Sequence, residues 1–200
     1  MMKPLAISTL LVAAVAGCAR DAGDGDAAAA PPSPPVTATD PAPTAAPADT
    51  AGVWVLDEHG VGPVRVGMRV AQADTATPGG LDRTTNLEPE CDVLQPKHGL
   101  SGLSFMVADA RVVRVEARDS ARVATRAGAR LGDSEARIRQ LYPAARVEPH
   151  KYDDRGHYII VIPGAPADTL YRIVFETDGS VVKEMRGGLW PPVEYVEGCS

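Results

Sequence analysis

The sequence has few cysteines, few aromatic residues and no apolar run long enough to cross a membrane. Its 200 residues include three cysteines, and aromatic side chains make up 4% of them. A transmembrane helix needs about 20 apolar residues in succession, and the apolar segment 5–16 is shorter than that. The formal net charge is −6, without the basic stripe that binds phosphate backbones. The composition therefore argues against a membrane-spanning helix and against a nucleic-acid partner.

The first 17 residues have the features of an export signal. Lys3 supplies the positive charge, residues 5–16 form the apolar core, and small residues precede Cys18. This arrangement resembles the lipobox of bacterial lipoproteins, in which the cysteine is lipidated and becomes the mature N-terminus. We therefore predict a signal peptide over residues 1–17 and lipidation of Cys18. Ordinary secretion stays open as an alternative, because Ala14-Val15-Ala16 also satisfies the rule for soluble cleavage.

Residues 18–51 are predicted to form a lipidated, disordered linker. Residues 19–51 contain twelve alanines and seven prolines, and Val36 is their single large aliphatic residue. Such a composition cannot fill a core and favours extended, solvated chain. In the lipoproteins that the signal resembles, an aspartate after the cysteine favours the inner membrane. Ala19 therefore points to the periplasmic face of the outer membrane.

The two remaining cysteines, Cys91 and Cys199, are an even pair in a chain expected to be exported. In that compartment a disulfide is the simplest interpretation. A bridge that closes a loop of about 110 residues would stabilise the fold by roughly 4 to 5 kcal/mol and hold the C-terminal segment in place. Two unpaired structural thiols remain the alternative.

Residues 52–200 suit one compact domain, within which we predict an internal repeat over about 60–118 and 125–188. Each half shows a glycine turn, a short helical pattern and alternating apolar positions typical of strands. The helical pattern near 135–142 is the clearest, with Asp133 or Ser134 as N-cap and Pro143 as its stop. The predicted fold class is α+β, with two helix-then-antiparallel-strand repeats in a single domain.

Patterns that carry chemistry are scarce in this domain. There is no Gly-x-Ser-x-Gly nucleophile motif, and we predict no catalytic residue, no metal site and no cofactor. His150 and His157 flank a turn that contains Asp153 and Asp154, which leaves a metal-dependent hydrolase as a third hypothesis. The candidate ligand contacts are instead the few aromatic and histidine side chains near turns and termini. They are Trp54, Tyr152, His157, Tyr158 and Trp190.

Several segments resemble an uncharacterised family of bacterial exported lipoproteins, some of which carry the label lectin. The segments that carry the resemblance lie near residue 65, over 126–142, over 149–158, at 175–179 and over 193–199. The internal repeat also resembles the units of small envelope modules, such as the lipoprotein subunit of outer-membrane assembly machines and the tandem-repeat inhibitors of β-lactamases. These likenesses imply a binding role and assign no catalytic residues.

The sequence therefore predicts a lipid-anchored binding module of the cell envelope that binds a protein and is not an enzyme. A carbohydrate-binding, lectin-like lipoprotein is the alternative. The expected partners are the membrane, through the lipid anchor, and an envelope protein or glycan.

Overall fold

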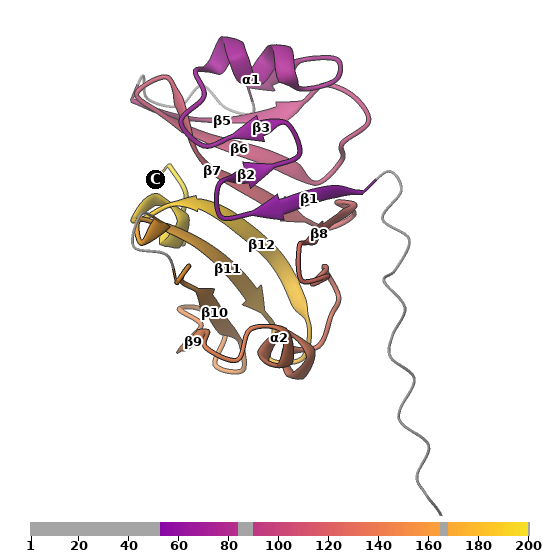
Figure 1. Cartoon of the computed structure of the whole chain (residues 1–200), viewed down its shortest axis with the longest axis vertical. Helices are drawn as coiled ribbons and strands as arrows, with labels where there is room; N and C mark the ends of the chain where they lie inside the picture. Colours follow the sequence, from indigo (N-terminus) through magenta and orange to yellow (C-terminus); the bar gives the residue numbers. More distant parts are fainter. Residues whose placement is uncertain (1–52, 84–89, 165–167, 200) are drawn as a thin grey trace, which may run out of the picture. The chain divides into compact units, whose positions relative to one another are not determined.

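Two β-sheets and two short α-helices are the main elements of the part of the chain that the structure describes (Figure 1). The computed structural model describes residues 53–83, 90–164 and 168–199. Cys18, the predicted signal peptide and the whole predicted linker lie outside the described residues. None of the helices among the described residues is long and apolar enough to cross a membrane.

The larger sheet has eight strands, and each neighbouring pair is antiparallel. In spatial order the strands are β4 (Leu81–Arg83), β5 (Cys91–Pro96), β6 (Leu103–Ala108), β7 (Arg111–Arg118), β12 (Val182–Leu189), β11 (Tyr171–Thr177), β10 (His157–Val161) and β9 (Arg146–Pro149). The central pair, β7 and β12, joins two antiparallel meanders that are far apart in the sequence. The smaller sheet contains β3 (Val64–Arg65), β2 (Gly60–Val61), β1 (Trp54–Asp57) and β8 (Val123–Thr125), with β1 and β8 parallel.

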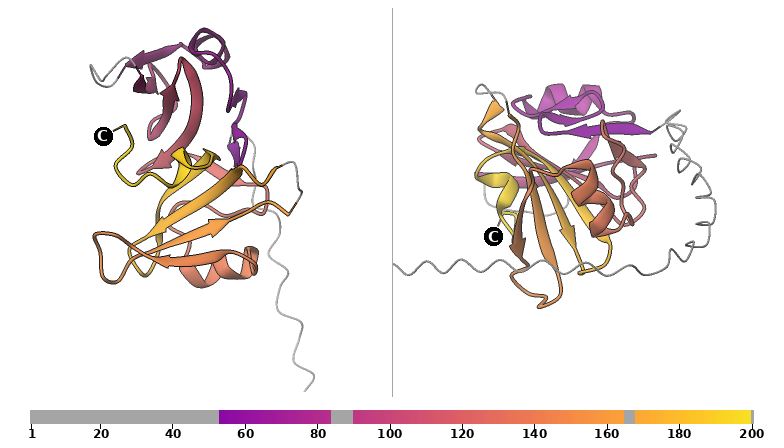
Figure 2. Two further views of the ribbon diagram at one scale, coloured as in Figure 1. Left: turned by 90° about the vertical axis from the view of Figure 1, so that its left-hand side faces the viewer. Right: turned by 60° about the horizontal axis from the view of Figure 1, so that its bottom comes forward.

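The predicted α+β fold class is wrong, because the described residues form twelve strands and only two short α-helices. These are α1 (Val70–Ala76) and α2 (Glu135–Leu141), each of seven residues. Ser134 caps α2 by accepting a hydrogen bond from the Arg137 N–H at 3.2 Å. Helices of two turns are too short to cover an eight-stranded sheet, so much of its inner face packs against the smaller sheet instead (Figure 2). The fold is therefore β-rich.

The main hydrophobic core lies on the face of the larger sheet that meets the smaller one. Phe105, Phe175 and Leu56 are each fully buried there. Gly187 on β12 permits the close approach of the sheets, because a Cβ at this position would lie 2.2 Å from the Asp57 carbonyl oxygen. The strand 157–161 contributes Ile159 to this core, and its neighbouring residues point to the opposite face. This strand is therefore buried on both faces, as its unbroken apolar sequence indicates.

The two helix-entry turns share a backbone hydrogen-bond pattern. The Gly67 N–H donates to the Val112 carbonyl at 2.8 Å, and the Gly132 N–H donates to the Val182 carbonyl at 2.9 Å. In each case a glycine turn before a helix is joined to the start of a central strand. This local correspondence supports the sequence similarity between the halves, while the domain boundaries and the internal repeat remain predictions.

Candidate functional site

The outer face of the larger sheet, which points away from the smaller sheet, carries charged side chains at its centre. Side chains of a strand alternate between its two faces, so every second residue of β7 points outward. The register pairs Arg118 with Glu184 and Glu116 with Arg186 across β7 and β12. We call the resulting set the charge ladder. Its members are Arg114, Glu116, Arg118, Glu184, Arg186 and Glu176.

Each glutamate of the charge ladder contacts at least one arginine, and the formal charges sum to zero. Arg118 Nη2 lies 2.7 Å from Glu184 Oε2 and 3.0 Å from Glu116 Oε2. Arg186 Nε donates to Glu184 at 2.8 Å, and its Nη2 contacts Glu176. Arg114 completes the ladder by pairing with Glu116. Opposite charges that alternate in this way compensate part of the cost of removing each ion from water.

Most of the charge ladder is shielded from solvent, and its pKa values reflect this. Burial alone would raise the pKa of Glu116, but Arg114 and Arg118 outweigh it and hold the pKa below its ordinary value of 4.5. Burial lowers the pKa of Arg114 despite Glu116. Burial tends to lower the pKa of Arg118, but Glu184 and Glu116 outweigh it and raise that pKa. Glu116 is therefore a carboxylate at neutral pH.

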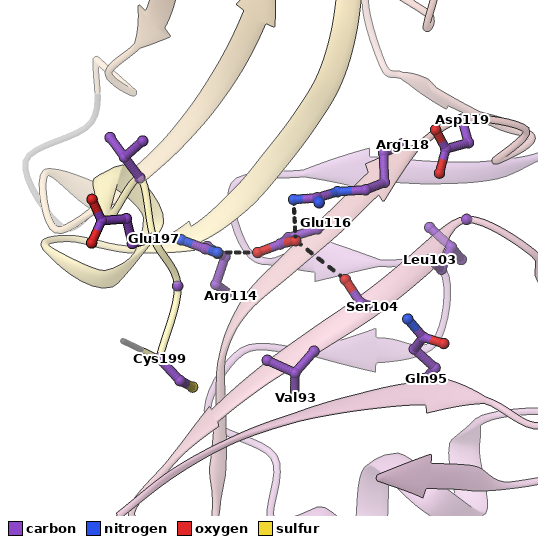
Figure 3. A pocket seen from close by; sticks show the side chains of 13 residues that line it. Val93, Gln95, Leu103, Ser104, Arg114, Glu116, Arg118, Asp119, Glu197 and Cys199 are labelled. Carbon is purple, nitrogen blue, oxygen red and sulfur yellow. Dashed lines mark hydrogen bonds and ion pairs between the residues drawn. The ribbon is translucent and has the colours of Figure 1, made fainter. Parts of the chain in front are cut away.

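A cavity of about 610 Å³ lies over β5, β6 and β7 beside the charge ladder (Figure 3). Its floor comes from the strands and one wall from residues 190–199, which we call the C-terminal segment. The lining residues are Val93, Gln95, Gly102, Leu103, Ser104, Arg114, Glu116, Arg118, Asp119, Val196, Glu197, Gly198 and Cys199. Ser104 donates a hydrogen bond to Glu116 at 3.2 Å, which ties the neighbouring strand to the ladder.

The C-terminal segment crosses the outer face of the sheet and is bound there by arginines. It includes a 3₁₀ turn, η2 (Pro192–Glu194). Arg114 Nη1 donates to the carbonyl oxygens of Pro192 at 2.9 Å and Tyr195 at 2.7 Å. Arg186 Nη1 donates to the Tyr195 carbonyl at 3.4 Å. Val193 is fully buried in a small apolar cluster beneath the turn.

The expected disulfide between Cys91 and Cys199 is present, with a Cα–Cα distance of 5.6 Å. It attaches the end of the C-terminal segment to the first residue of β5. Cys199 also lines the cavity. The disulfide therefore holds one wall of the cavity against its floor.

Three side chains of the cavity carry polar groups that are available to a ligand. The Arg118 side chain is 49% exposed, and its two hydrogen-bonded contacts both use Nη2, so Nε and Nη1 have no partner among the described residues. Gln95 and Asp119 are exposed, and their side chains form no hydrogen bond or ion pair with any described residue. The cavity thus offers arginine N–H donors, an amide and a carboxylate.

The aromatic candidates from the sequence do not line this cavity, and they do not converge on another one. Trp54 is half-buried on β1 and lines a separate cavity of about 280 Å³. Tyr158 is 8% exposed, stacks on His150 with ring centroids 4.7 Å apart, and lines a third cavity of about 140 Å³. Trp190 is 46% exposed beside Leu170, at the far end of β12.

Tyr152 and His157 have structural partners. Tyr152 is 63% exposed, and its hydroxyl contacts the Glu197 carboxylate on the C-terminal segment. His157 Nδ1 lies 2.8 Å from Glu135 Oε1, which also accepts from the Thr177 hydroxyl. Burial tends to raise the pKa of Glu135, but these hydrogen bonds lower it. This contact joins the first turn of α2 to the sheet.

The two histidines of the metal hypothesis have different partners. His150 Nε2 lies 3.1 Å from Glu176, and its Nδ1 accepts the N–H groups of Tyr152 and Asp153 at 3.0 Å each. Because Nδ1 is an acceptor, the hydrogen-bond network assigns the proton to Nε2. Within the ranges that the structure describes, no cluster of three histidine, cysteine, aspartate or glutamate side chains could hold a metal ion.

Sequence reasoning missed the charge ladder and the cavity beside it. The only local signal is the alternation Arg114-x-Glu116-x-Arg118 on one strand and Glu184-x-Arg186 on another. Such alternation ordinarily marks a solvated strand face, and only the pairing of β7 with β12 places the two stretches in contact.

The chain matches no family model, no curated protein and no solved structure.

Proposed function

We propose that the protein is a lipid-anchored binding module of the cell envelope that holds another protein at the cavity over β5, β6 and β7. One observation carries the proposal: the cavity combines a floor of mutually fixed charges with exposed, unused polar groups. Fixed donors and acceptors in a concave site are the features of recognition. The lipid anchor at Cys18 and the linker that follows it are predictions from the sequence.

The chemistry of the lining supports binding rather than catalysis. A general acid or base works best when its pKa lies near the working pH. The pKa of Glu116 is instead lowered by two arginines, and Cys199 is held in a disulfide. Arginine itself stays protonated. The residues that line the cavity can therefore orient a partner, but they are poorly suited to proton transfer or nucleophilic attack.

The same lining favours a protein over a glycan as the partner. Aromatic rings commonly provide the flat surface on which a sugar stacks, and among the described residues no aromatic side chain lines this cavity. The five candidate contacts suggested by the sequence lie elsewhere. A protein partner needs hydrogen-bonding groups and shape instead, which the cavity provides.

Site-specific photocrosslinking tests the proposal. A photoreactive amino acid replaces Gln95 at the cavity, and a matched variant carries it at Gln140, an exposed position on α2. In cells that express the full chain, the position 95 variant should yield a discrete crosslinked protein band that the position 140 variant lacks. Identical bands from both positions, or no protein crosslink from position 95, would overturn the proposal. Crosslinking of position 95 to glycan alone would favour the lectin-like alternative.

A further inference from the structure

The outer face of the larger sheet already binds one peptide segment, the chain's own C-terminal segment. Arg114 and Arg186 hold it through its main-chain carbonyl oxygens at Pro192 and Tyr195. Those contacts involve main-chain atoms of the segment and not its side chains. The charge ladder thus includes guanidinium groups that recognise peptide carbonyls, and it continues into the neighbouring cavity.

Arg118 is the one arginine of the charge ladder that does not contact the C-terminal segment among the described residues. Its side chain is 49% exposed, whereas those of Arg114 and Arg186 are 4% and 2% exposed. Its Nε and Nη1 groups have no partner among the described residues, and they can donate to acceptors in the cavity. The Arg118 guanidinium therefore has available N–H donors of the kind that Arg114 and Arg186 use to bind the C-terminal segment.

We infer that the cavity binds an extended peptide segment of the partner protein, with backbone carbonyl oxygens on Arg118 and backbone N–H groups on both Gln95 and Asp119. The inference rests on the proposed function and specifies the class of ligand. A peptide backbone alternates acceptors and donors, which matches this set of groups. The formal charges of the charge ladder sum to zero, so the ladder has no net charge that would favour a charged ligand over an uncharged peptide backbone.

The spacing of the site suits a short segment. Leu94 lies opposite Phe105, and Gln95 is the next residue along β5, while Ser104 lies opposite Glu116. Gln95 is therefore two strands away from β7. With strands about 4.8 Å apart and residues about 3.3 Å apart along each strand, the distance from Gln95 to Arg118 is roughly 12 Å. Roughly four extended residues span that distance.

A display library of random heptapeptides, selected against the full chain, tests the inference. The selected peptides are then titrated against three variants. Arg118→Gln removes the guanidinium and should weaken binding about tenfold, because a hydrogen bond to a charged donor is lost. Gln95→Ala removes an exposed side chain without a partner, so folding should be unaffected while binding weakens about threefold. Arg122→Gln, a matched change at an exposed position outside the cavity, should leave affinity unchanged.

The inference fails if no heptapeptide is enriched, or if selected peptides bind Gln95→Ala and the wild-type chain equally. It also fails if a glycan array gives a ligand that Arg118→Gln abolishes while the peptide library gives none. The outcome is separate from that of the proposed function. A protein crosslinked at position 95 together with an unproductive peptide library would retain the protein partner and reject the extended segment.

Discussion

Removal of the Cys91–Cys199 disulfide should destabilise the protein substantially. The two cysteines are 108 residues apart, so the bridge restricts most of the unfolded domain. In the chain-entropy description, a loop of this length corresponds to about 4.8 kcal/mol. The double variant Cys91→Ala/Cys199→Ala is preferable to a single change, because it leaves no thiol to pair with Cys18.

Non-covalent contacts reduce the expected loss. Arg114 and Arg186 still hold the Tyr195 carbonyl, and Glu197 still contacts Lys151 at 3.0 Å. Only the last few residues are then free to separate from β5 in the folded state, and their regained freedom offsets part of the cost. We therefore expect a loss of about 3–5 kcal/mol in the free energy of unfolding, or roughly 6–20 °C in Tm for a domain of this size.

Urea titration of the full chain, followed by far-UV circular dichroism, measures this loss. The slope of the free energy against urea should rise in the variant, because its unfolded chain exposes more surface. Wild-type protein treated with a dithiol reductant is the matched control and should reproduce the variant. A loss below about 1 kcal/mol, or a reduced wild-type protein as stable as the oxidised one, would refute the reasoning.

Three further predictions concern the charge ladder and the anchor. Arg186→Met leaves Glu184 and Glu176 without their buried partner, and urea titration should show a loss of about 3–5 kcal/mol. The exposed control Arg155→Met should change stability by less than about 0.5 kcal/mol. Because the pKa of Glu116 is lowered in the folded state, its stabilising contribution is complete above the ordinary carboxylate value and is lost as the pH falls through the lowered pKa. Urea midpoints measured at decreasing pH should therefore fall more steeply for wild type than for Glu116→Gln. Cys18→Ser should abolish metabolic labelling with an alkyne fatty acid and release the protein from the membrane fraction.

Each of these predictions has a contradicting result. Equal stability of the Arg186→Met and Arg155→Met variants would show that the charge ladder contributes nothing to the fold. Parallel pH profiles for wild type and Glu116→Gln would remove that carboxylate from the acid response. Fatty-acid labelling that persists in Cys18→Ser would place the lipid elsewhere or remove the lipoprotein prediction.

Local features were predictable from the sequence because local physics produces them. The alternation of Leu103, Phe105 and Val107 predicts a strand whose apolar face is buried, and all three side chains lie in the core. Asp133 or Ser134 predicts the start of α2 and Pro143 its end, and the helix begins after Ser134 and ends before Pro143. The even pair of domain cysteines predicts the disulfide, which is present.

The candidate contacts were harder to predict because residue type alone does not show what a side chain touches. Tyr158 and His157 have the polar tips typical of binding residues. In the structure one is buried against His150, and the other is paired with Glu135. His157 and Glu135 are far apart in the sequence, and Tyr158 and His150 lie on opposite sides of a hairpin. Exposure and partner are properties of the folded sheet.

By itself, the sequence determined the strand pattern, the short helix near residue 135, the pairing of the two domain cysteines and the expectation of an exported, anchored chain. Tertiary structure alone decided that a second sheet covers the inner face, and that Glu116 and Arg186 lie opposite each other. The physical reason is that β7 and β12 are about 70 residues apart in the chain, and their register depends on the packing of both meanders. This non-local pairing buries most of a row of alternating charges and leaves Arg118 exposed at the cavity.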